Sequence, residues 1–119
     1  HPHTRNVLNE FNIKSKIDFI EPMGYLALLK SLDDCELVIT DSGGLQKEAY
    51  FARKKCLTVR SETEWTELTR GGFNILSEPE SIAVNLESLM NKECDFSTNL
   101  YGEGSSSTII FDSIKSYLS

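Results

Sequence analysis

Apolar residues recur along this chain with two spacings, one typical of amphipathic helices and one typical of strands. Spacings of three and four predict helices at Thr4–Phe11, Tyr25–Asp34, Gly43–Arg53 and Thr63–Thr69, from Pro79 onward, and over residues 109–118. Short apolar or alternating runs predict strands at Lys16–Ile20, Leu37–Ile39, Cys56–Val59 and Phe73–Leu76. The segment Asn91–Ser107 is polar and rich in glycine and serine, so we expect a connection there.

Local capping signals refine two of these helices. Thr63 is the expected N-cap of its short helix, and Gly71-Gly72 the expected end. Pro79 stands at the favoured first turn of the next helix.

Strands that alternate with helices predict an α/β fold with a parallel sheet and right-handed crossovers. In open sheets of this kind, ligands bind beyond the carboxyl ends of the strands. Three turns follow predicted strands at that edge, namely Glu21–Met23, Asp41–Gly44 and Arg60–Thr63. We therefore expect one composite binding site built from these turns.

The turn Asp41-Ser42-Gly43-Gly44 ends a predicted strand and opens a predicted helix. The first amides of a helix lack intrahelical partners and lie at its positive end, which favours a phosphate. Glu48, six residues after Ser42, is placed to reach a ribose attached to such a phosphate. The alternative is an ordinary turn, in which Ser42 caps the helix and the glycines relieve steric strain.

Composition and charge limit the classes of protein to which the chain can belong. Its 119 residues suit a single domain, and 39% hydrophobic with 25% charged residues is typical of a globular protein. A net charge of −6 argues against a nucleic-acid surface. No apolar run is long enough for a membrane span and no signal pattern opens the chain. Three cysteines without metal spacing predict free thiols in a reducing cytoplasm and no metal site.

A set of short motifs, taken in order, resembles one enzyme family. The motifs are His1-Pro2-His3-Thr4, Asp41-Ser42-Gly43-Gly44-Leu45-Gln46-Lys47-Glu48, Arg60-Ser61-Glu62-Thr63-Glu64, Gly71-Gly72-Phe73-Asn74 and Tyr101-Gly102-Glu103-Gly104. Together they resemble the C-terminal half of the non-hydrolysing UDP-N-acetylglucosamine 2-epimerases. The resemblance covers nearly the whole chain, although each motif alone is short.

This resemblance implies a fold, a ligand and an incomplete architecture. The implied fold is the Rossmann-like C-terminal half-domain of the glycosyltransferase-B-like (UDP-glycosyltransferase/phosphorylase) class, with residues 1–119 as a single nucleotide-sugar-binding domain. The family's protein is roughly three times this length, so the N-terminal catalytic domain and the first two strands of this domain are expected to be absent. The strand at Lys16–Ile20 would then either pair beside Leu37–Ile39 or leave a gap for a partner chain.

The resemblance also implies roles for particular residues. Ser42, Gly43 and Gly44 would bind the diphosphate, and Glu48 the ribose. Arg60 ends a strand at the ligand edge and would approach phosphate, unless Glu62 or Glu64 pairs with it. Met23 and Leu28 occupy positions that line the nucleotide pocket in the family. For Leu28 the alternative is an ordinary core position.

Other residues of the motifs are expected to be structural. Thr63 and Glu64 would shape their loop by capping. His1 and His3 carry no expected catalytic role. The tail at Tyr101–Gly104 resembles a linker into a terminal helix that crosses back to the missing domain.

One departure from the family pattern concerns the exact sugar. Many members have Arg-Pro after the Thr-Glu pair, where this chain has Trp65-Thr66. The arginine would have been a candidate diphosphate contact. The Thr-Glu-Trp form resembles a bacterial branch that epimerises modified UDP-sugars for surface polysaccharides.

The implied reaction uses no redox cofactor. The proton at carbon 2 is removed while UDP leaves, and both return with carbon 2 inverted. No carboxylate in this chain is an obvious acid or base for that step, so no catalytic residue is assigned and the chain alone should be inactive. A homodimer is a further possibility that the resemblance leaves open.

Two other classes stay open at this point. One is the donor-binding domain of a UDP-sugar glycosyltransferase, which shares the fold and the phosphate turn. The other is a receiver-like module with Asp41 as phosphoacceptor, although such a module needs an early acidic cluster that this chain does not show.

Overall fold

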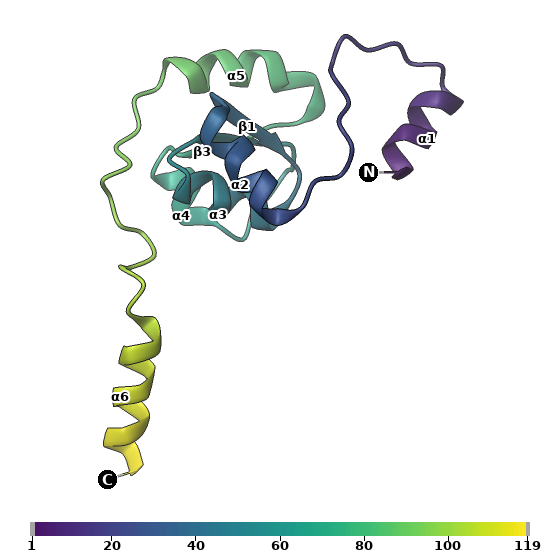
Figure 1. Cartoon of the computed structure of the whole chain (residues 1–119). Helices are drawn as coiled ribbons and strands as arrows, with labels where there is room; N and C mark the ends of the chain where they lie inside the picture. Colours follow the sequence, from purple (N-terminus) through teal and green to yellow (C-terminus); the bar gives the residue numbers. More distant parts are fainter. Residues whose placement is uncertain (1, 119) are drawn as a thin grey trace.

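The predicted alternation of helices and strands is present in the computed structural model, which describes residues 2–118 (Figure 1). The helices are α1 (Pro2–Glu10), α2 (Tyr25–Asp34), α3 (Gly43–Phe51), α4 (Thr66–Arg70), α5 (Ile82–Asn91) and α6 (Ser106–Leu118). The strands are β1 (Leu37–Thr40), β2 (Lys55–Thr58) and β3 (Asn74–Leu76), and a 3₁₀ turn, η1 (Pro79–Ser81), leads into α5. His1, part of the first motif, lies outside the described residues.

The three strands form one parallel sheet in the order β1-β2-β3. Thr40 pairs with Thr58, and Thr58 pairs with Leu76, so the carboxyl ends of all three strands meet at one edge. Backbone bonds continue beyond the strands at that edge, because the amide of Val59 donates to Thr40 and the amide of Ser77 to Thr58. The turns that follow β1 and β2 therefore begin side by side.

Helices cover both faces of this sheet. In Figure 1, α2, α3 and α4 lie on one side of the strands and α5 on the other. The main core lies under α2 and α3 and contains Leu32, Val38, Ala49 and Cys56, all buried. On the α5 side, Leu89 is fully buried, and the Lys55 ammonium donates to the carbonyls of Leu89 and Met90 at the end of the helix.

A second cluster, largely aromatic, joins α3 and α4 to the long connection after α5. Tyr50, Leu68 and Phe73 are buried, and Phe96 and Tyr101 pack against them from the connection. The Tyr50 ring meets Phe73 edge to face with centroids 5.0 Å apart, a favoured aromatic arrangement. The Tyr50 hydroxyl also donates to the carbonyl of Thr98. This cluster fixes the start of the segment that leads to α6.

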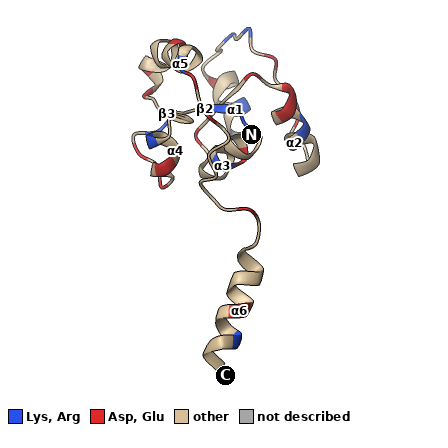
Figure 2. Ribbon diagram, turned by 90° about the vertical axis from the view of Figure 1, so that its left-hand side faces the viewer, with Lys and Arg blue, Asp and Glu red and all other residues tan. Residues whose placement is uncertain are grey.

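The first and last helices lie away from the sheet (Figure 1). Every residue of α6 is exposed, and the apolar residues among them include Ile109, Phe111 and Ile114. Figure 2 shows α6 almost without charge, with only Asp112 and Lys115 in its sequence. Among the described helices, none is both long enough and apolar enough to cross a membrane.

The strand predicted at Lys16–Ile20 is wrong, because these residues have no regular structure. Ile17 and Phe19 are 72% and 58% exposed, so their side chains do not pack on a sheet. A strand is stabilised by cross-strand pairs, and nothing in residues 2–118 pairs with this segment. Of the two alternatives for this segment, pairing beside Leu37–Ile39 is therefore also wrong, and one edge of β1 has no neighbour among the described residues.

The helix predicted at Thr63–Thr69 starts later, because α4 begins at Thr66 after Trp65 as N-cap. Thr63 does not cap it; its hydroxyl is engaged with Gln46 and with the Trp65 amide. The predicted end is confirmed, since Gly71 is the C-cap and Gly72 has a φ of +79°. Other predicted bounds agree to within two or three residues.

Cys56 lies in β2 as a buried free thiol, with 1% of its surface exposed. Burial raises its pKa to about 11, and the contact with the Thr58 hydroxyl offsets this only in part. Because the pKa of an unfolded cysteine is about 8.5, the neutral thiol stabilises the fold fully below that pH. This contribution is lost as the pH rises toward about 11.

We expect iodoacetamide at a pH of about 8.5 to alkylate Cys35 and Cys94 in the folded protein and to leave Cys56 unmodified. The thiolate is the reactive form, and Cys56 is both protonated and inaccessible under these conditions. Peptide mass spectrometry after short labelling measures the result, and labelling in about 8 M urea is the control for intrinsic reactivity. Equal modification of all three cysteines in the native protein would contradict the burial described.

Candidate functional site

The turn at the start of α3 is capped by its own serine. Ser42 has extended backbone angles, φ −80° and ψ 131°, and its hydroxyl accepts from the Leu45 amide at 3.5 Å. Its amide donates to the Thr40 hydroxyl at 3.0 Å. The cap satisfies one of the free amides of the helix end. Within the described residues, no side chain accepts from the amides of Gly43 and Gly44.

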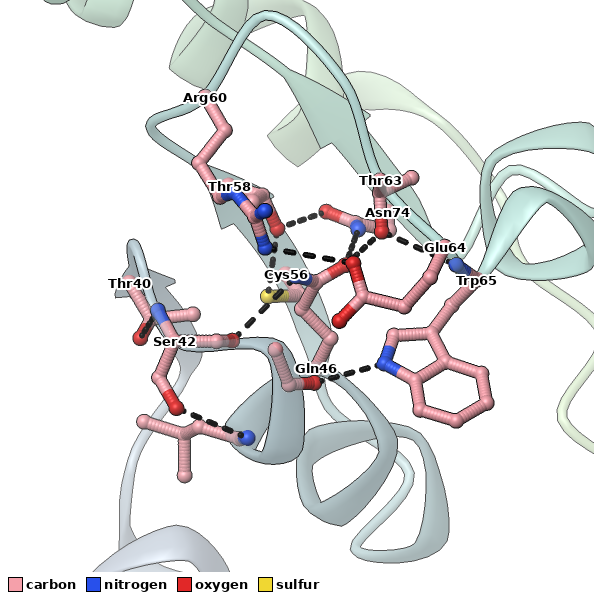
Figure 3. A network of polar contacts seen from close by, with 12 residues as sticks. Thr40, Ser42, Gln46, Cys56, Thr58, Arg60, Thr63, Glu64, Trp65 and Asn74 are labelled. Atoms are coloured by element: carbon pink, nitrogen blue, oxygen red, sulfur yellow. Dashed lines mark hydrogen bonds and ion pairs between the residues drawn. The ribbon is translucent and has the colours of Figure 1, made fainter.

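A buried glutamine of α3 forms hydrogen bonds that fix this turn. Gln46 is fully buried, and its amide nitrogen donates to the Ser42 carbonyl at 3.3 Å. Its side-chain oxygen accepts from the Thr63 hydroxyl at 2.7 Å and from the Asn74 amide at 2.9 Å. Figure 3 shows these groups converging from α3, from the loop after β2 and from β3. One side chain therefore joins three segments that are distant in the sequence.

The buried network continues along the sheet. The Thr58 hydroxyl donates to the Asn74 side-chain oxygen at 2.8 Å, and both residues are almost completely buried. In residues 2–118, every buried side-chain nitrogen and oxygen has a hydrogen-bond partner. A fully satisfied buried network stabilises one conformation, because each unpaired member would cost its desolvation energy.

Trp65 contacts the same turn from the side. Its indole N–H donates to the Gly43 carbonyl at 2.8 Å, and its backbone amide donates to the Thr63 hydroxyl at 3.1 Å. The Lys47 ammonium lies 4.4 Å from the centroid of the Trp65 ring and 4.3 Å from that of Tyr101. These distances suit cation–π attraction to both rings.

Tyr101 is anchored in turn by an acid on α4. Its hydroxyl donates to the Glu67 carboxylate at 2.6 Å. This hydrogen bond lowers the pKa of Glu67, whereas burial and the same carboxylate raise the pKa of Tyr101. The motif at Tyr101–Gly104 thus packs against α4, while α6 beyond it is exposed.

Arg60 is paired with Glu64 at the edge of the turn, which settles which glutamate is its partner. The guanidinium nitrogen is 3.3 Å from the carboxylate, and both side chains are partly exposed. The other carboxylate oxygen of Glu64 lies so close to Gly43 that a Cβ there would collide with it. An exposed pair of this kind contributes little stability, so it can open for a ligand.

The predicted site residues are thus brought together only in part. Ser42, Gly43 and Gly44 form the helix end as expected, Glu48 is half-buried on α3, and Arg60 lies nearby. The remaining two lie elsewhere, Met23 just before α2 and Leu28 within it. No hydrogen bond among residues 2–118 joins them to the turn, and the Met23 sulfur instead accepts from Ser31.

Four residues of the site had no assigned role in the sequence interpretation: Gln46, Thr58, Trp65 and Asn74. Gln46 and Asn74 stood inside the motifs, and Trp65, directly after one of them, was noted only as a departure from the family pattern. The available signal was that Gln46 lies three residues after Gly43 and three before Ala49, on a helix face of small residues. Its partners Thr63 and Asn74 come from the loop after β2 and from β3, so local spacing does not reveal them.

The arrangement provides a rigid pair of backbone donors at the positive end of a nine-residue helix, with one cation beside it. Such a helix end binds anions through N–H groups and the helix dipole. Within the described part of the chain, no group of three histidine, cysteine, aspartate or glutamate residues is arranged to hold a metal ion.

Comparison with known proteins gives these features a family context. The family model described as UDP-N-acetylglucosamine 2-epimerase matches residues 1–115. A UDP-2,3-diacetamido-2,3-dideoxy-D-glucuronate 2-epimerase from Pseudomonas aeruginosa is 39% identical over 112 residues, covering 92% of this chain and 32% of that protein. A UDP-N-acetylglucosamine 2-epimerase from Methanococcus maripaludis is 40% identical over 118 residues, with coverage of 92% and 32%.

Solved structures agree with the sequence comparison. The UDP-GlcNAc 2-epimerase of Methanocaldococcus jannaschii in complex with UDP-GlcNAc and UDP has a TM-score of 0.80 at 36% identity, covering 97% of this chain and 34% of that one. The S. aureus MnaA–UDP structure has a TM-score of 0.75 at 28% identity, with coverage of 99% and 34%. The expected Rossmann-like, glycosyltransferase-B-like fold is confirmed. The chain spans about a third of the length of these relatives.

We expect Asn74→Ala to lower the free energy of unfolding by about 1–3 kcal/mol. The change removes one donor to Gln46 and leaves the Thr58 hydroxyl without its acceptor. Urea unfolding followed by circular dichroism measures the loss as a lower midpoint.

Asn85→Ala is the matched control for this variant. The Asn85 amide donates to Ser77 on the other side of the fold, and the Ser77 hydroxyl keeps its bond to Glu78. We expect a loss of less than about 1 kcal/mol. Equal midpoints for the Asn74 variant and wild type would mean that the buried network does not stabilise the turn.

Proposed function

The chain belongs to the UDP-N-acetylglucosamine 2-epimerase family, and we propose that it holds the UDP part of a UDP-amino sugar while carbon 2 is inverted. The observation that carries this proposal is the pair of unpartnered amides at Gly43 and Gly44. They lie at the N-terminus of α3, in a fold shared with two solved relatives whose structures contain UDP. In this proposal, residues 1–119 act as one nucleotide-sugar-binding domain.

The proposed role of the turn is electrostatic. When UDP leaves the sugar, negative charge develops on the diphosphate, and oriented amide dipoles stabilise that charge without reorganising. The Gly43 and Gly44 amides are held in place by a capped helix and a buried network. The same donors would retain UDP until it adds back to the sugar.

Two side chains complete the proposed UDP contacts. Glu48 lies on α3 beyond the turn, half-buried, and would accept hydrogen bonds from the ribose hydroxyls. The Arg60 guanidinium would break its ion pair with the Glu64 carboxylate and pair with a phosphate oxygen instead. Met23 and Leu28 stay proposals for the nucleotide pocket and are supported only by the resemblance.

The acid–base chemistry is not assigned to this chain. Proton removal at carbon 2 needs a group within hydrogen-bond reach of that carbon. The chain covers about a third of its relatives, and we propose that the corresponding residues belong to a domain outside these 119 residues. The isolated chain should then bind UDP weakly and invert no sugar.

The finer points of the function are proposals of the same kind. The Pseudomonas aeruginosa relative acts on a diacetamido sugar, whereas other relatives are named for UDP-N-acetylglucosamine. Both substrates contain an amino sugar on UDP. A cytoplasmic location, a role in polysaccharide biosynthesis and a homodimer are proposed from the resemblance alone, and the relatives include archaeal as well as bacterial proteins.

We expect UDP to shift the amide resonances of Gly43 and Gly44 in a ¹⁵N–¹H titration of the full chain. Ser42→Gly, which removes the hydroxyl but leaves most of the capping energy, should raise the Kd for UDP about 3- to 10-fold. Glu48→Gln should have an effect of similar size, because charge-assisted bonds to the ribose weaken.

Ser61→Gly and Glu62→Gln are the matched controls, because both residues are exposed and lie in the loop after β2. We expect the Kd in both variants to stay within about twofold of wild type. The proposed site would be refuted if UDP did not shift the amide resonances of Gly43 and Gly44. It would also be refuted if Ser42→Gly and Glu48→Gln bound UDP as tightly as wild type and the two controls.

A variant of the Arg60–Glu64 pair gives a further test, in which the affinity for UDP is expected to rise and not to fall. Glu64→Gln removes a negative charge beside Gly43 and releases Arg60, so UDP should bind about 2- to 5-fold more tightly. The gain should shrink as salt is raised, since the charges are exposed. Glu62→Gln is again the control. A lower affinity in Glu64→Gln would show that Glu64 assists nucleotide binding.

A further inference from the structure

Trp65 is the single tryptophan of the chain, and its polar atom is directed at the candidate phosphate turn. We infer that Trp65 is a positioning residue: its indole N–H holds the Gly43 carbonyl so that the Gly44 amide is presented to the diphosphate. This inference rests on the proposed function, because it concerns how the same turn is held for its ligand.

The geometry of the peptide bond links the two groups. The described residues contain no cis peptide bond, so the Gly43 carbonyl and the Gly44 N–H share one plane and point in opposite directions. The indole nitrogen lies 2.8 Å from that carbonyl oxygen. Fixing the carbonyl on the Trp65 side therefore fixes the amide on the opposite side.

The preceding peptide is held in the same way by Gln46. Its side-chain nitrogen donates to the Ser42 carbonyl, which shares a plane with the Gly43 N–H. Two consecutive peptides thus each receive a side-chain donor on the carbonyl (Figure 3). A hydrogen bond on a carbonyl polarises its peptide, so the amide on the other end becomes a stronger donor.

The indole itself is held on its far side. Lys47 lies over both Trp65 and Tyr101, and the two rings meet nearly at right angles with centroids 6.5 Å apart. Lys47 follows the turn on α3, whereas Tyr101 comes from the connection before α6. The ring can therefore not turn away from Gly43 without losing these contacts.

Trp65 stands where the resemblance expects an arginine that contacts the diphosphate. The half-buried indole points into the protein, toward the back of the turn. The two residue types would thus serve the same ligand by different routes, one by direct charge and one by orienting a backbone donor.

The test is Trp65→Phe in the full chain, which keeps an aromatic ring beside Lys47 and removes the N–H together with the second ring of the indole. We expect the Gly44 amide resonance to move in the free protein and the Kd for UDP to rise about 3- to 10-fold. The thermal unfolding midpoint should fall, because the smaller ring leaves part of the indole site empty, so both quantities are measured well below that midpoint. A ¹⁵N–¹H titration gives the resonances and the Kd together.

Tyr117→Phe is the control, because its hydroxyl lies on the exposed helix α6 and not in the cluster around the turn. Its Kd for UDP should stay within about twofold of wild type. If Trp65→Phe binds UDP as tightly as wild type, or leaves the Gly44 resonance in place, the positioning role is wrong. The proposed function would survive that result, whereas absence of UDP binding by wild type would refute both.

Discussion

The buried side chain of Gln46 is the constraint on which this site depends. It accepts from Thr63 and Asn74 and donates to the Ser42 carbonyl, so the start of α3, the loop after β2 and the start of β3 cannot move independently. A buried amide of this kind is costly unless all its partners are present. The parallel register places Asn74 opposite Cys56 on β2, and the loop after β2 brings Thr63 to the same side chain.

The consequence for function is that the protein presents backbone donors and not a charged pocket. Net charge is −6, and the nearest cation to the turn, Arg60, is already paired with Glu64. Affinity for a diphosphate must therefore come from oriented amides at a helix end and from a few local contacts. The Ser42 and Gly43 carbonyls, which belong to the same peptide groups as those amides, accept hydrogen bonds from Gln46 and Trp65. In the proposed function, departing UDP would be stabilised by amide dipoles whose direction folding has already fixed.

Local patterns predicted the elements that are stabilised locally or by a continuous apolar face. The strand at Leu37–Ile39 and the helix from Gly43 were found because an apolar run, a serine cap and a glycine pair each have one common structural meaning. Lys16–Ile20 has the alternation of a strand, but no strand among the described residues pairs with it. The sequence of a segment does not show whether a second strand is available to pair with it. Thr63 is not the cap because its hydroxyl oxygen accepts from the Trp65 amide, ahead of the helix that begins at Thr66, while its hydrogen is donated to Gln46. The proposed ligand, UDP, was inferred from the motif resemblance. The buried network that orients the turn became visible only in the three-dimensional contacts.

The central claim is that the amides of Gly43 and Gly44, oriented by side chains behind them, bind the diphosphate of UDP. A crystal structure of the full chain soaked with UDP tests it most directly. The account predicts phosphate oxygens at roughly 2.7–3.2 Å from both amide nitrogens, with the Gln46 and Trp65 bonds to the turn intact. A structure in which UDP is ordered but its phosphates lie elsewhere, with the start of α3 unoccupied, would contradict it.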